Sequence, residues 1–185
     1  MTQRKRRGAS TACGRRGHYH VPRSGADKIL SWPELLRQRK LWRKRGETVV
    51  WTNGCFDLIH VGHILSLQQA RQQGDILVVG LNSDTAIRRI KGPDRPVVRA
   101  PERLQIIAAL EAVDYVILFN EDTPEHALSR LKPDVHCKGA DYAPPNGKPI
   151  PEAKVVNSYG GRIVFLPMIS LRSTTNLIQR IRKQA

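Results

Sequence analysis

The sequence lacks several features that would assign it to other classes of protein. No apolar run approaches the roughly 18 residues that a membrane span needs. The basic N-terminus has no apolar stretch of the kind found in a secretory signal. The three cysteines of the chain, Cys13, Cys55 and Cys137, are widely separated and form no CxxC or cysteine–histidine spacing, which argues against a metal held by protein ligands. We therefore expect a cytoplasmic protein with free thiols.

Acidic residues are absent from the first part of the chain. No aspartate or glutamate precedes Asp27, whereas residues 1–23 contain seven lysines and arginines, which leaves +8 of the net charge of +15 for residues 24–185. Residues 1–25 have no hydrophobic periodicity, so we expect a disordered basic tail followed by one domain over 26–185. The tail is either a solvated extension or a segment that binds nucleic acid. The charge of the domain itself suits polyanionic ligands.

From position 31 the chain alternates between short β-branched segments and amphipathic helices. Strands are predicted at 48–52, 75–81, 115–119, 135–138 and 162–166, with helices between them and a final helix over 174–183. Strands that alternate with helices of this length form βαβ units, and right-handed crossovers place helices on both faces of the sheet. We therefore predict an α/β fold, with an open and mostly parallel sheet of about five strands.

The most informative stretch joins the first predicted strand to the next helix, and it reads TNGCFDLIHVGH over 52–63. Gly54 is predicted to let the backbone approach a ligand. His60 and His63 lie three residues apart at the opening of a helix, where they can share one face and where the helix terminus favours phosphate. Two imidazoles can donate hydrogen bonds to phosphate oxygens as charge develops, and Gly62 would leave room for a nucleotide between them. The structural alternative is a helix cap or an adventitious metal site.

These residues resemble the cytidylyltransferase-like nucleotidyltransferase family, whose signature is G-x-F-D followed by H-x-G-H. Here the signature reads Gly54-Cys55-Phe56-Asp57 and His60-Val61-Gly62-His63. Other strings are similar to the adenylyltransferases of this family that make ADP-heptose. These strings are Asn82-Ser83-Asp84, Lys91-Gly92 with Arg95-Pro96-Val97, Leu110-Glu111-Ala112-Val113-Asp114, Glu121-Asp122-Thr123-Pro124, Lys138-Gly139-Ala140-Asp141-Tyr142 and Ser173-Thr174-Thr175-Asn176. The resemblance covers roughly residues 30–183.

The resemblance implies a Rossmann-like fold and an enzyme that transfers AMP from ATP to a sugar 1-phosphate. D-glycero-β-D-manno-heptose 1-phosphate is the implied acceptor, pyrophosphate leaves, and the ADP-heptose product serves lipopolysaccharide assembly. Mg²⁺ is implied as the companion of ATP, and relatives of this kind are often homodimers. A sugar phosphate is already an anionic nucleophile, so the transfer needs alignment and charge stabilisation but no general base. At 185 residues no kinase domain fits, so we expect a separate kinase to supply the acceptor.

The resemblance also implies roles for individual residues. The predicted catalytic residues are His60, His63 and Lys91. The predicted nucleotide contacts are Asn53, Gly54, Cys55, Phe56, Gly62, Arg172, Ser173, Thr174 and Thr175. The predicted substrate contacts are Asp57, Asn82, Arg103, Lys138 and Asp141. The approach to the last helix departs from the usual Ile-Ser-Thr-Thr of the family, which bears on the role of Arg172 but not on the hydroxyls.

Structural alternatives accompany several of these roles. Lys91 and Arg103 could be ordinary surface residues, Asp57 could only order its turn, and Lys138 could form a salt bridge with Asp141. Two other functions stay open as well. The same fold serves cytidylyl transfer to glycerol 3-phosphate or adenylyl transfer to a vitamin phosphate. The third hypothesis is a nucleic-acid-binding protein that acts through its basic tail, although the sequence has no aromatic RNA-binding platform and no helix-turn-helix signal.

Overall fold

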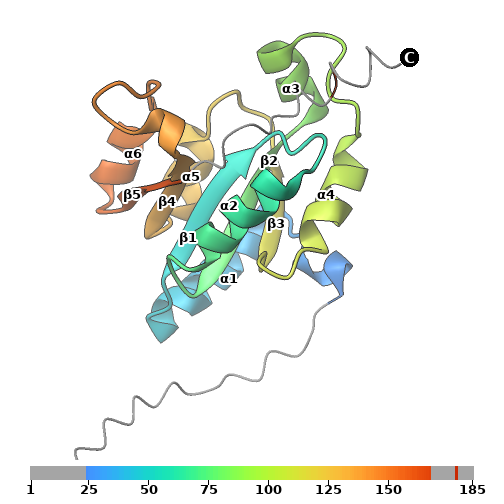
Figure 1. The fold of residues 1–185 in the computed structure, drawn as a ribbon. Helices are drawn as coiled ribbons and strands as arrows, with labels where there is room; N and C mark the ends of the chain where they lie inside the picture. Colours follow the sequence, from blue (N-terminus) through green and yellow to red (C-terminus); the bar gives the residue numbers. More distant parts are fainter. Residues whose placement is uncertain (1–23, 168–177, 179–185) are drawn as a thin grey trace, which may run out of the picture.

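The computed structural model describes residues 24–167 and Ile178. Its centre is a five-stranded sheet with the strand order β3-β2-β1-β4-β5, in which every neighbouring pair is parallel (Figure 1). The strands are β1 (Val49–Gly54), β2 (Ile76–Asn82), β3 (Tyr115–Phe119), β4 (Val135–Gly139) and β5 (Arg162–Leu166). The predicted α/β fold with an open parallel sheet is therefore confirmed.

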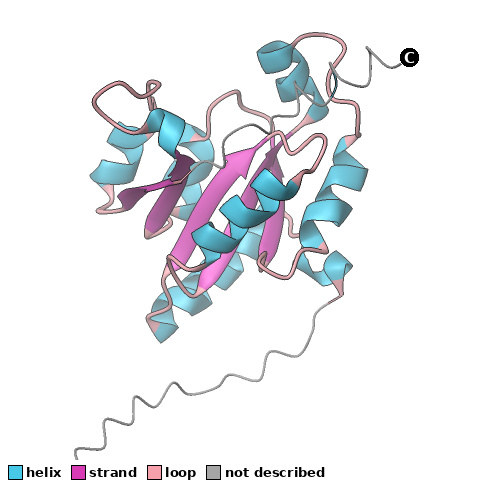
Figure 2. Ribbon diagram, viewed as in Figure 1, coloured by secondary structure: helices cyan, strands magenta, loops and turns pink. Residues whose placement is uncertain are grey.

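Helices cover both faces of this sheet, as predicted (Figure 2). The helices are α1 (Trp32–Arg45), α2 (Val61–Arg71), α3 (Asp84–Lys91), α4 (Ala100–Ala108), α5 (Glu125–Leu131) and α6 (Ala153–Ser158), with 3-10 turns η1 (Gly25–Lys28) and η2 (Ala140–Tyr142). One buried cluster joins the sheet to α2 and α4, for example through Leu67 and Ile107, and a second joins it to α1 and α5 through Leu35 and Leu128. The predicted helix over 174–183 lies outside the described residues, apart from Ile178.

Local signals in the sequence explain where the helices begin and end. The Ser31 amide donates to the Glu34 carboxylate over 2.8 Å at the start of α1, and Gly46 ends that helix with a left-handed φ of 70°. The Ala86 amide donates to the Ser83 hydroxyl over 3.1 Å, which caps α3. Among the described residues, no helix combines the length and the apolar character that a membrane span requires.

The segment before α1 belongs to the packed part of the molecule. The Lys28 ammonium donates to the Leu110 carbonyl over 3.1 Å, and the Leu30 amide donates to the Val116 carbonyl of β3 over 3.0 Å. Residues from Ser24 onward thus cover the β3 edge of the sheet. The predicted boundary between tail and domain, at residue 25, falls where η1 begins.

The strand order creates a switch point between β1 and β4. From β1 the chain crosses to β2 on one side, while β4 lies on the other side of β1. Main-chain pairing of β1 with β2 runs from Val49 to Gly54, but pairing of β1 with β4 ends at Trp51 and His136. Ligands of open α/β sheets bind beyond the carboxyl ends of the strands at such a point. The stretch over 52–63 leaves the sheet there.

Candidate functional site

The two histidines of the sequence motif form a stacked pair at the start of α2. His60 is the N-cap residue, with extended backbone angles, and His63 lies in the first helical turn. Their ring centroids are 3.9 Å apart and the ring planes differ by 26°. Both side chains are half-buried, so the pair lies at the surface of the carboxyl edge and not in the interior. This placement is the one that the motif predicted.

The surroundings of His63 set its charge and its tautomer. Burial, together with the nearby His60 ring, lowers the pKa of His63 from 6.5 to about 4. The ring is therefore neutral at physiological pH. Its Nδ1 accepts the backbone N–H of His60 over 3.4 Å, so the neutral ring carries its proton on Nε2. Nε2 is thus the ring atom of His63 that can donate a hydrogen bond.

The two glycines of the motif make room for aromatic rings. A Cβ atom on Gly62 would lie 3.0 Å from both Cε1 and Nδ1 of His60, and a Cβ on Gly54 would lie 3.2 Å from Cε2 of Phe56. Because the imidazoles stack directly on one another, no nucleotide fits between them, and that part of the prediction is wrong. Gly62 instead lets the His60 ring lie close against the helix start.

Phe56 has an unusual backbone conformation for its size. Its φ is 45°, a region that a bulky side chain rarely enters. Its ring is nearly buried and lies 5.4 Å from the His63 ring, tilted by 55°. Backbone strain of this kind persists only where the surroundings enforce it, and it clusters at functional sites. The ring forms one wall against which His63 packs.

Asp57 orders a neighbouring loop. Its nearly inaccessible carboxylate accepts the Arg95 Nε–H over 2.6 Å and the backbone amides of Val97 and Val98 over 2.9 Å. Burial alone would raise the pKa of Asp57, but these donors outweigh it and lower the pKa. The side chain thus ties the β1–α2 connection to residues 95–98. Its contacts match the structural alternative considered for this residue, although it was predicted to contact substrate.

Arg103 is fully buried under the site. Its guanidinium donates to the carbonyls of Cys55 over 2.6 Å, Asn82 over 2.9 Å and Val98 over 3.0 Å, and to the Asp84 carboxylate over 2.8 Å. Its side chain is inaccessible to solvent, so it is neither the predicted substrate contact nor the surface arginine of the alternative. It joins the segments that follow β1 and β2 to the loop before α4, and so it positions the site.

Cations gather around the end of β1. Burial raises the pKa of the Cys55 thiol, while the charges of Lys91, Arg103 and Arg95 oppose that rise, which places all three cations in range of this thiol. Lys91 is exposed at the last position of α3. A thiol with a raised pKa is a poor nucleophile, so we assign no covalent role to Cys55. The local positive charge suits a polyphosphate.

The residues predicted after β4 are paired with other partners. Lys138 donates from Nζ to Glu152 Oε1 over 2.7 Å, and Lys148 donates to Asp141 Oδ2 over 2.5 Å. The salt bridge between Lys138 and Asp141 that sequence reasoning considered is therefore not formed. Glu152 also accepts a hydrogen bond from buried His136 over 3.1 Å. These contacts tie the loop after β4 to the start of α6.

The remaining predicted residues fall into two groups. Asn53 accepts from the Trp51 indole over 3.3 Å, and Asn82 is buried and donates to the Glu121 carbonyl over 3.1 Å. Both amides therefore bind protein groups at the ends of β1 and β2. The segment with Arg172, Ser173, Thr174 and Thr175 lies outside the described residues. Its predicted phosphate contacts stay predictions.

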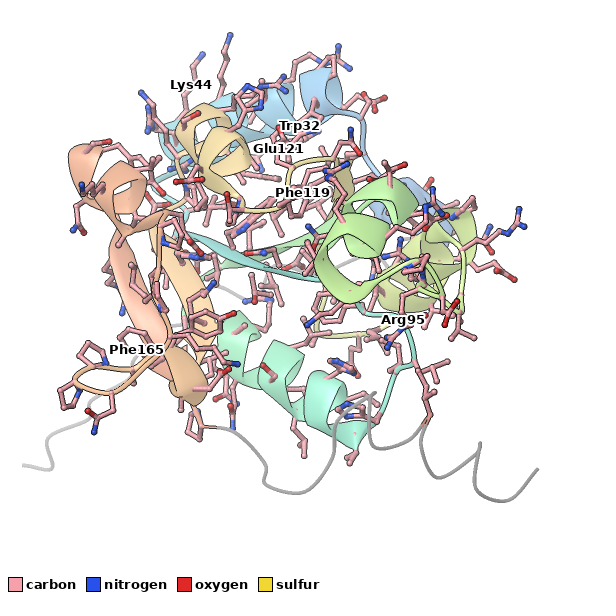
Figure 3. All side chains as sticks on the ribbon, turned by 90° about the horizontal axis from the view of Figure 1, so that it is seen from above. Trp32, Lys44, Arg95, Phe119, Glu121 and Phe165 are labelled. Atoms are coloured by element: carbon pink, nitrogen blue, oxygen red, sulfur yellow. The ribbon has the colours of Figure 1, made fainter. Side chains whose placement is uncertain are left out.

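Sequence reasoning missed the roles of Arg95 and Glu152. Arg95 follows Gly92 and lies between Pro93 and Pro96 in the loop after α3, and Figure 3 shows it on the side of α3 and α4, away from Phe165 of β5. The burial of Arg95 is not visible in the sequence, and the one usable signal is Asp57 in the motif, because a carboxylate that becomes buried requires a partner. Glu152 gives no comparable local signal, since its partners lie 14 and 16 residues away.

Comparisons with known proteins find a matching family model and similar relatives. A family model described as cytidylyltransferase-like matches residues 51–179. The bifunctional protein HldE of Syntrophotalea carbinolica is 53% identical over 156 residues, which cover 84% of this chain and 31% of the relative. HldE of Geotalea uraniireducens is 48% identical over 166 residues, which cover 90% and 33%. The chain thus spans about a third of the length of these curated relatives.

Solved structures with a similar fold include one at 28% identity and one that is more distant in sequence. The lipopolysaccharide core biosynthesis protein of Thermoplasma volcanium aligns with a TM-score of 0.54 and 28% identity, over 69% of this chain and 100% of that protein. Pantothenate synthetase of Thermus thermophilus aligns with a TM-score of 0.55 and 16% identity, over 85% of this chain and 70% of that one, which speaks for the fold alone. With its stacked histidines, its parallel sheet and a family match over most of its length, the chain belongs to the cytidylyltransferase-like family.

Proposed function

We propose that this protein is an adenylyltransferase that transfers AMP from ATP to a sugar 1-phosphate. The acceptor that we propose is D-glycero-β-D-manno-heptose 1-phosphate, and the products are ADP-heptose and pyrophosphate. The stacked pair of His60 and His63 at the N-terminus of α2 carries this proposal. The choice of acceptor is supported by the identity of about half to HldE proteins and by the structural likeness to a lipopolysaccharide core biosynthesis protein.

The chemistry of the pair suits an in-line transfer. An oxygen of the acceptor phosphate attacks the α-phosphorus, and the bond from the α-phosphorus to the bridging oxygen breaks as pyrophosphate leaves. Charge on the non-bridging oxygens is then stabilised by donors that were placed beforehand. Neutral His63 donates from Nε2, because its Nδ1 already accepts the His60 amide. The exposed ammonium of Lys91 adds positive charge beside the same phosphates.

We assign the other residues by what they contact. Asp57 and Arg103 hold the loops around the pair and so fix its position. Lys138 and Asp141 are proposed to meet the ligand at the end of β4, while Ser173, Thr174 and Thr175 are proposed to bind the phosphates. Backbone groups of Gly54, Cys55 and Phe56 complete the nucleotide site.

Mg²⁺ is proposed to enter with ATP and to neutralise part of its triphosphate charge. The described residues contain no group of three or more His, Cys, Asp or Glu side chains that could hold a metal ion. The donors at hand therefore do not fit a metal caged by protein, and Mg²⁺ commonly takes most of its ligands from phosphates and water. We route no step of the transfer through it.

A substrate panel tests the proposal. Pyrophosphate release is measured with ATP or CTP, each combined with heptose 1-phosphate, glycerol 3-phosphate or a vitamin phosphate. We expect release with ATP and heptose 1-phosphate and very little with the other pairs. Release that requires CTP would refute the adenylyl assignment, and release only with glycerol 3-phosphate would refute the sugar acceptor.

We also propose that residues 26–185 form the catalytic unit and that the basic tail is accessory. A variant that lacks residues 1–23 retains η1, the contact of Lys28 with Leu110 and the contact of Leu30 with Val116. We expect it to keep the full rate of pyrophosphate release. If transfer is lost with the tail, this division is wrong. If the full chain binds nucleic acid tightly and transfers no AMP, the hypothesis of a nucleic-acid-binding protein replaces that of an adenylyltransferase.

A further inference from the structure

A buried charged cluster lies beneath the loop that follows β4. The Glu152 side chain is only 1% exposed, yet it accepts hydrogen bonds from His136 and Lys138. Burial favours the protonated acid, but the hydrogen bonds from these two residues outweigh it and lower the pKa of Glu152 to about 2. The pKa of His136 is lowered by burial, so its ring is neutral and donates from Nε2. The cluster is thus a carboxylate held between one neutral donor and one cation.

The cation of this cluster connects the interior to the loop. Lys138 is the last residue but one of β4, which ends at Gly139, and its side chain is 12% exposed. Its Nζ lies between the Glu152 carboxylate, at 2.7 Å, and the ring of Tyr142, at 4.0 Å from the centroid. Fixing this ammonium therefore also fixes the position of Tyr142 in η2.

The loop is closed on itself beyond Tyr142. The Lys148 ammonium contacts the Asp141 carboxylate, and the Lys148 amide donates to the Asp141 carbonyl over 2.9 Å. Lys148 also lies 5.4 Å from the Tyr142 ring centroid. An aromatic ring, a carboxylate and two ammonium groups are thereby collected at the carboxyl end of β4. Such groups suit the base, the ribose hydroxyls and the phosphates of a nucleotide.

The strand order indicates which substrate this loop meets. β4 lies next to β1 at the switch point of the sheet, and the stretch that carries the histidine pair follows β1. A nucleotide bound at that pair, beyond the carboxyl ends of β1 and β4, lies beside the loop that follows β4.

We propose that Glu152 is a positioning residue for the nucleotide, which acts through Lys138 to fix the loop over residues 139–148 against the bound ATP. The inference rests on the proposed function only in taking ATP as the nucleotide. Glu152 is too deeply buried to touch a ligand itself. Its carboxylate instead holds the Lys138 ammonium in one place, and the ammonium holds the loop.

The test measures binding of Mg²⁺–ATP to the full chain by calorimetry, without an acceptor. Glu152→Gln should weaken binding about tenfold, because the uncharged amide no longer fixes the ammonium, and Glu152→Asp should recover most of the loss. The matched control is Asp114→Asn, which removes another buried carboxylate, paired with Arg71 at the amino end of β2. We expect it to change ATP affinity less than about twofold. Unchanged ATP binding in folded Glu152→Gln would overturn the inference.

A double-mutant cycle separates positioning from general destabilisation. Lys138→Gln removes the cation of the same contact, and this side chain is partly exposed. The variant therefore tests the inference even if Glu152→Gln does not fold. It should weaken ATP binding to a similar degree, and the double variant should be little worse than either single variant. Effects that multiply would contradict action through Lys138. A rise in KM for the sugar 1-phosphate with unchanged ATP binding would contradict the placement over the nucleotide.

These outcomes are distinct from those of the proposed function. If no acceptor supports pyrophosphate release while ATP binding responds to the variants as expected, the proposed transfer fails and the role of Glu152 stands. If heptose 1-phosphate is adenylylated by wild type but Glu152→Gln binds ATP normally, the transfer stands and the role of Glu152 fails.

Discussion

The two ends of the sheet use the same kinds of ion pair for different purposes. At the amino ends, Asp134 and Asp114 accept the amides of Val49 and Leu77 over 2.8 and 2.7 Å, and arginines pair with both carboxylates. Each carboxylate there binds a main-chain amide of a strand. At the carboxyl ends, charged side chains hold loops instead, as Asp57 does with Arg95 and Glu152 does with Lys138, and two half-buried imidazoles lie at the same edge.

This difference separates stability from function. The contacts at the amino ends satisfy backbone groups that the strands leave unpaired, so they favour the folded state. The histidine pair opposes folding only below pH 6.5, because burial and the nearby His60 ring lower the pKa of His63 to about 4. Groups with strongly perturbed pKa values gather at functional sites, where the cost is compensated elsewhere in the molecule.

The largest expected effect is on stability, at the arginine beneath the site. Arg103→Met leaves the Asp84 carboxylate and three carbonyls without their donor, so we expect the free energy of unfolding to fall by about 3–5 kcal/mol. Arg71→Met at the amino end is the control, since its guanidinium is 35% exposed and its loss should cost about 1 kcal/mol. Urea unfolding measures both. Equal losses of unfolding free energy in the two variants would contradict the proposed difference between the two ends of the sheet.

A smaller effect is expected at the glycine beside the imidazoles. Gly62→Ala places a methyl group 3.0 Å from the His60 ring, so the ring must shift and we expect the transfer rate to fall about tenfold. The control is Gly25→Ala, whose new methyl group would meet its nearest neighbour at 3.7 Å. Steady-state pyrophosphate release measures the rate. If both alanine variants are as fast as wild type, the position of the His60 ring does not matter.

The smallest effect is on the pH dependence of stability. His63 takes up a proton near pH 6.5 when unfolded but only near pH 4 when folded, so the unfolded state binds more protons in this interval. His63 therefore lowers the free energy of unfolding as the pH falls from 6.5 to about 4, and has no such effect above 6.5. Subtracting the curve of His63→Gln from that of wild type isolates this contribution. A difference that is flat across the interval would contradict the low pKa.

Much of the fold could be predicted because its signals are local. Ser31 with Glu34, the left-handed Gly46 and the cap at Ser83 mark helix ends within a few residues. The strands of the sequence prediction agree with the structure to within two residues at each end. The position of His60 and His63 at a helix start after a strand could be predicted in the same way.

The rest of the site depends on contacts between distant residues. Arg103 reaches Cys55 across 48 positions, and neither spacing nor composition shows that its side chain is buried. The stacking of the two imidazoles and the positive φ of Phe56 are set by how the turn folds back on itself. Local patterns therefore show where the motif lies on the sheet but not which side chains contact one another around it.

The most direct test of the central claim is the single-turnover rate of AMP transfer by His63→Ala, with ATP and heptose 1-phosphate both saturating. The stacked pair should lose one donor to the transition state, so we predict a rate about 10²–10³ times lower than that of wild type, with unchanged unfolding by urea at neutral pH. A folded His63→Ala protein that transfers AMP within about threefold of the wild-type rate would show that the histidine pair is not the catalytic centre.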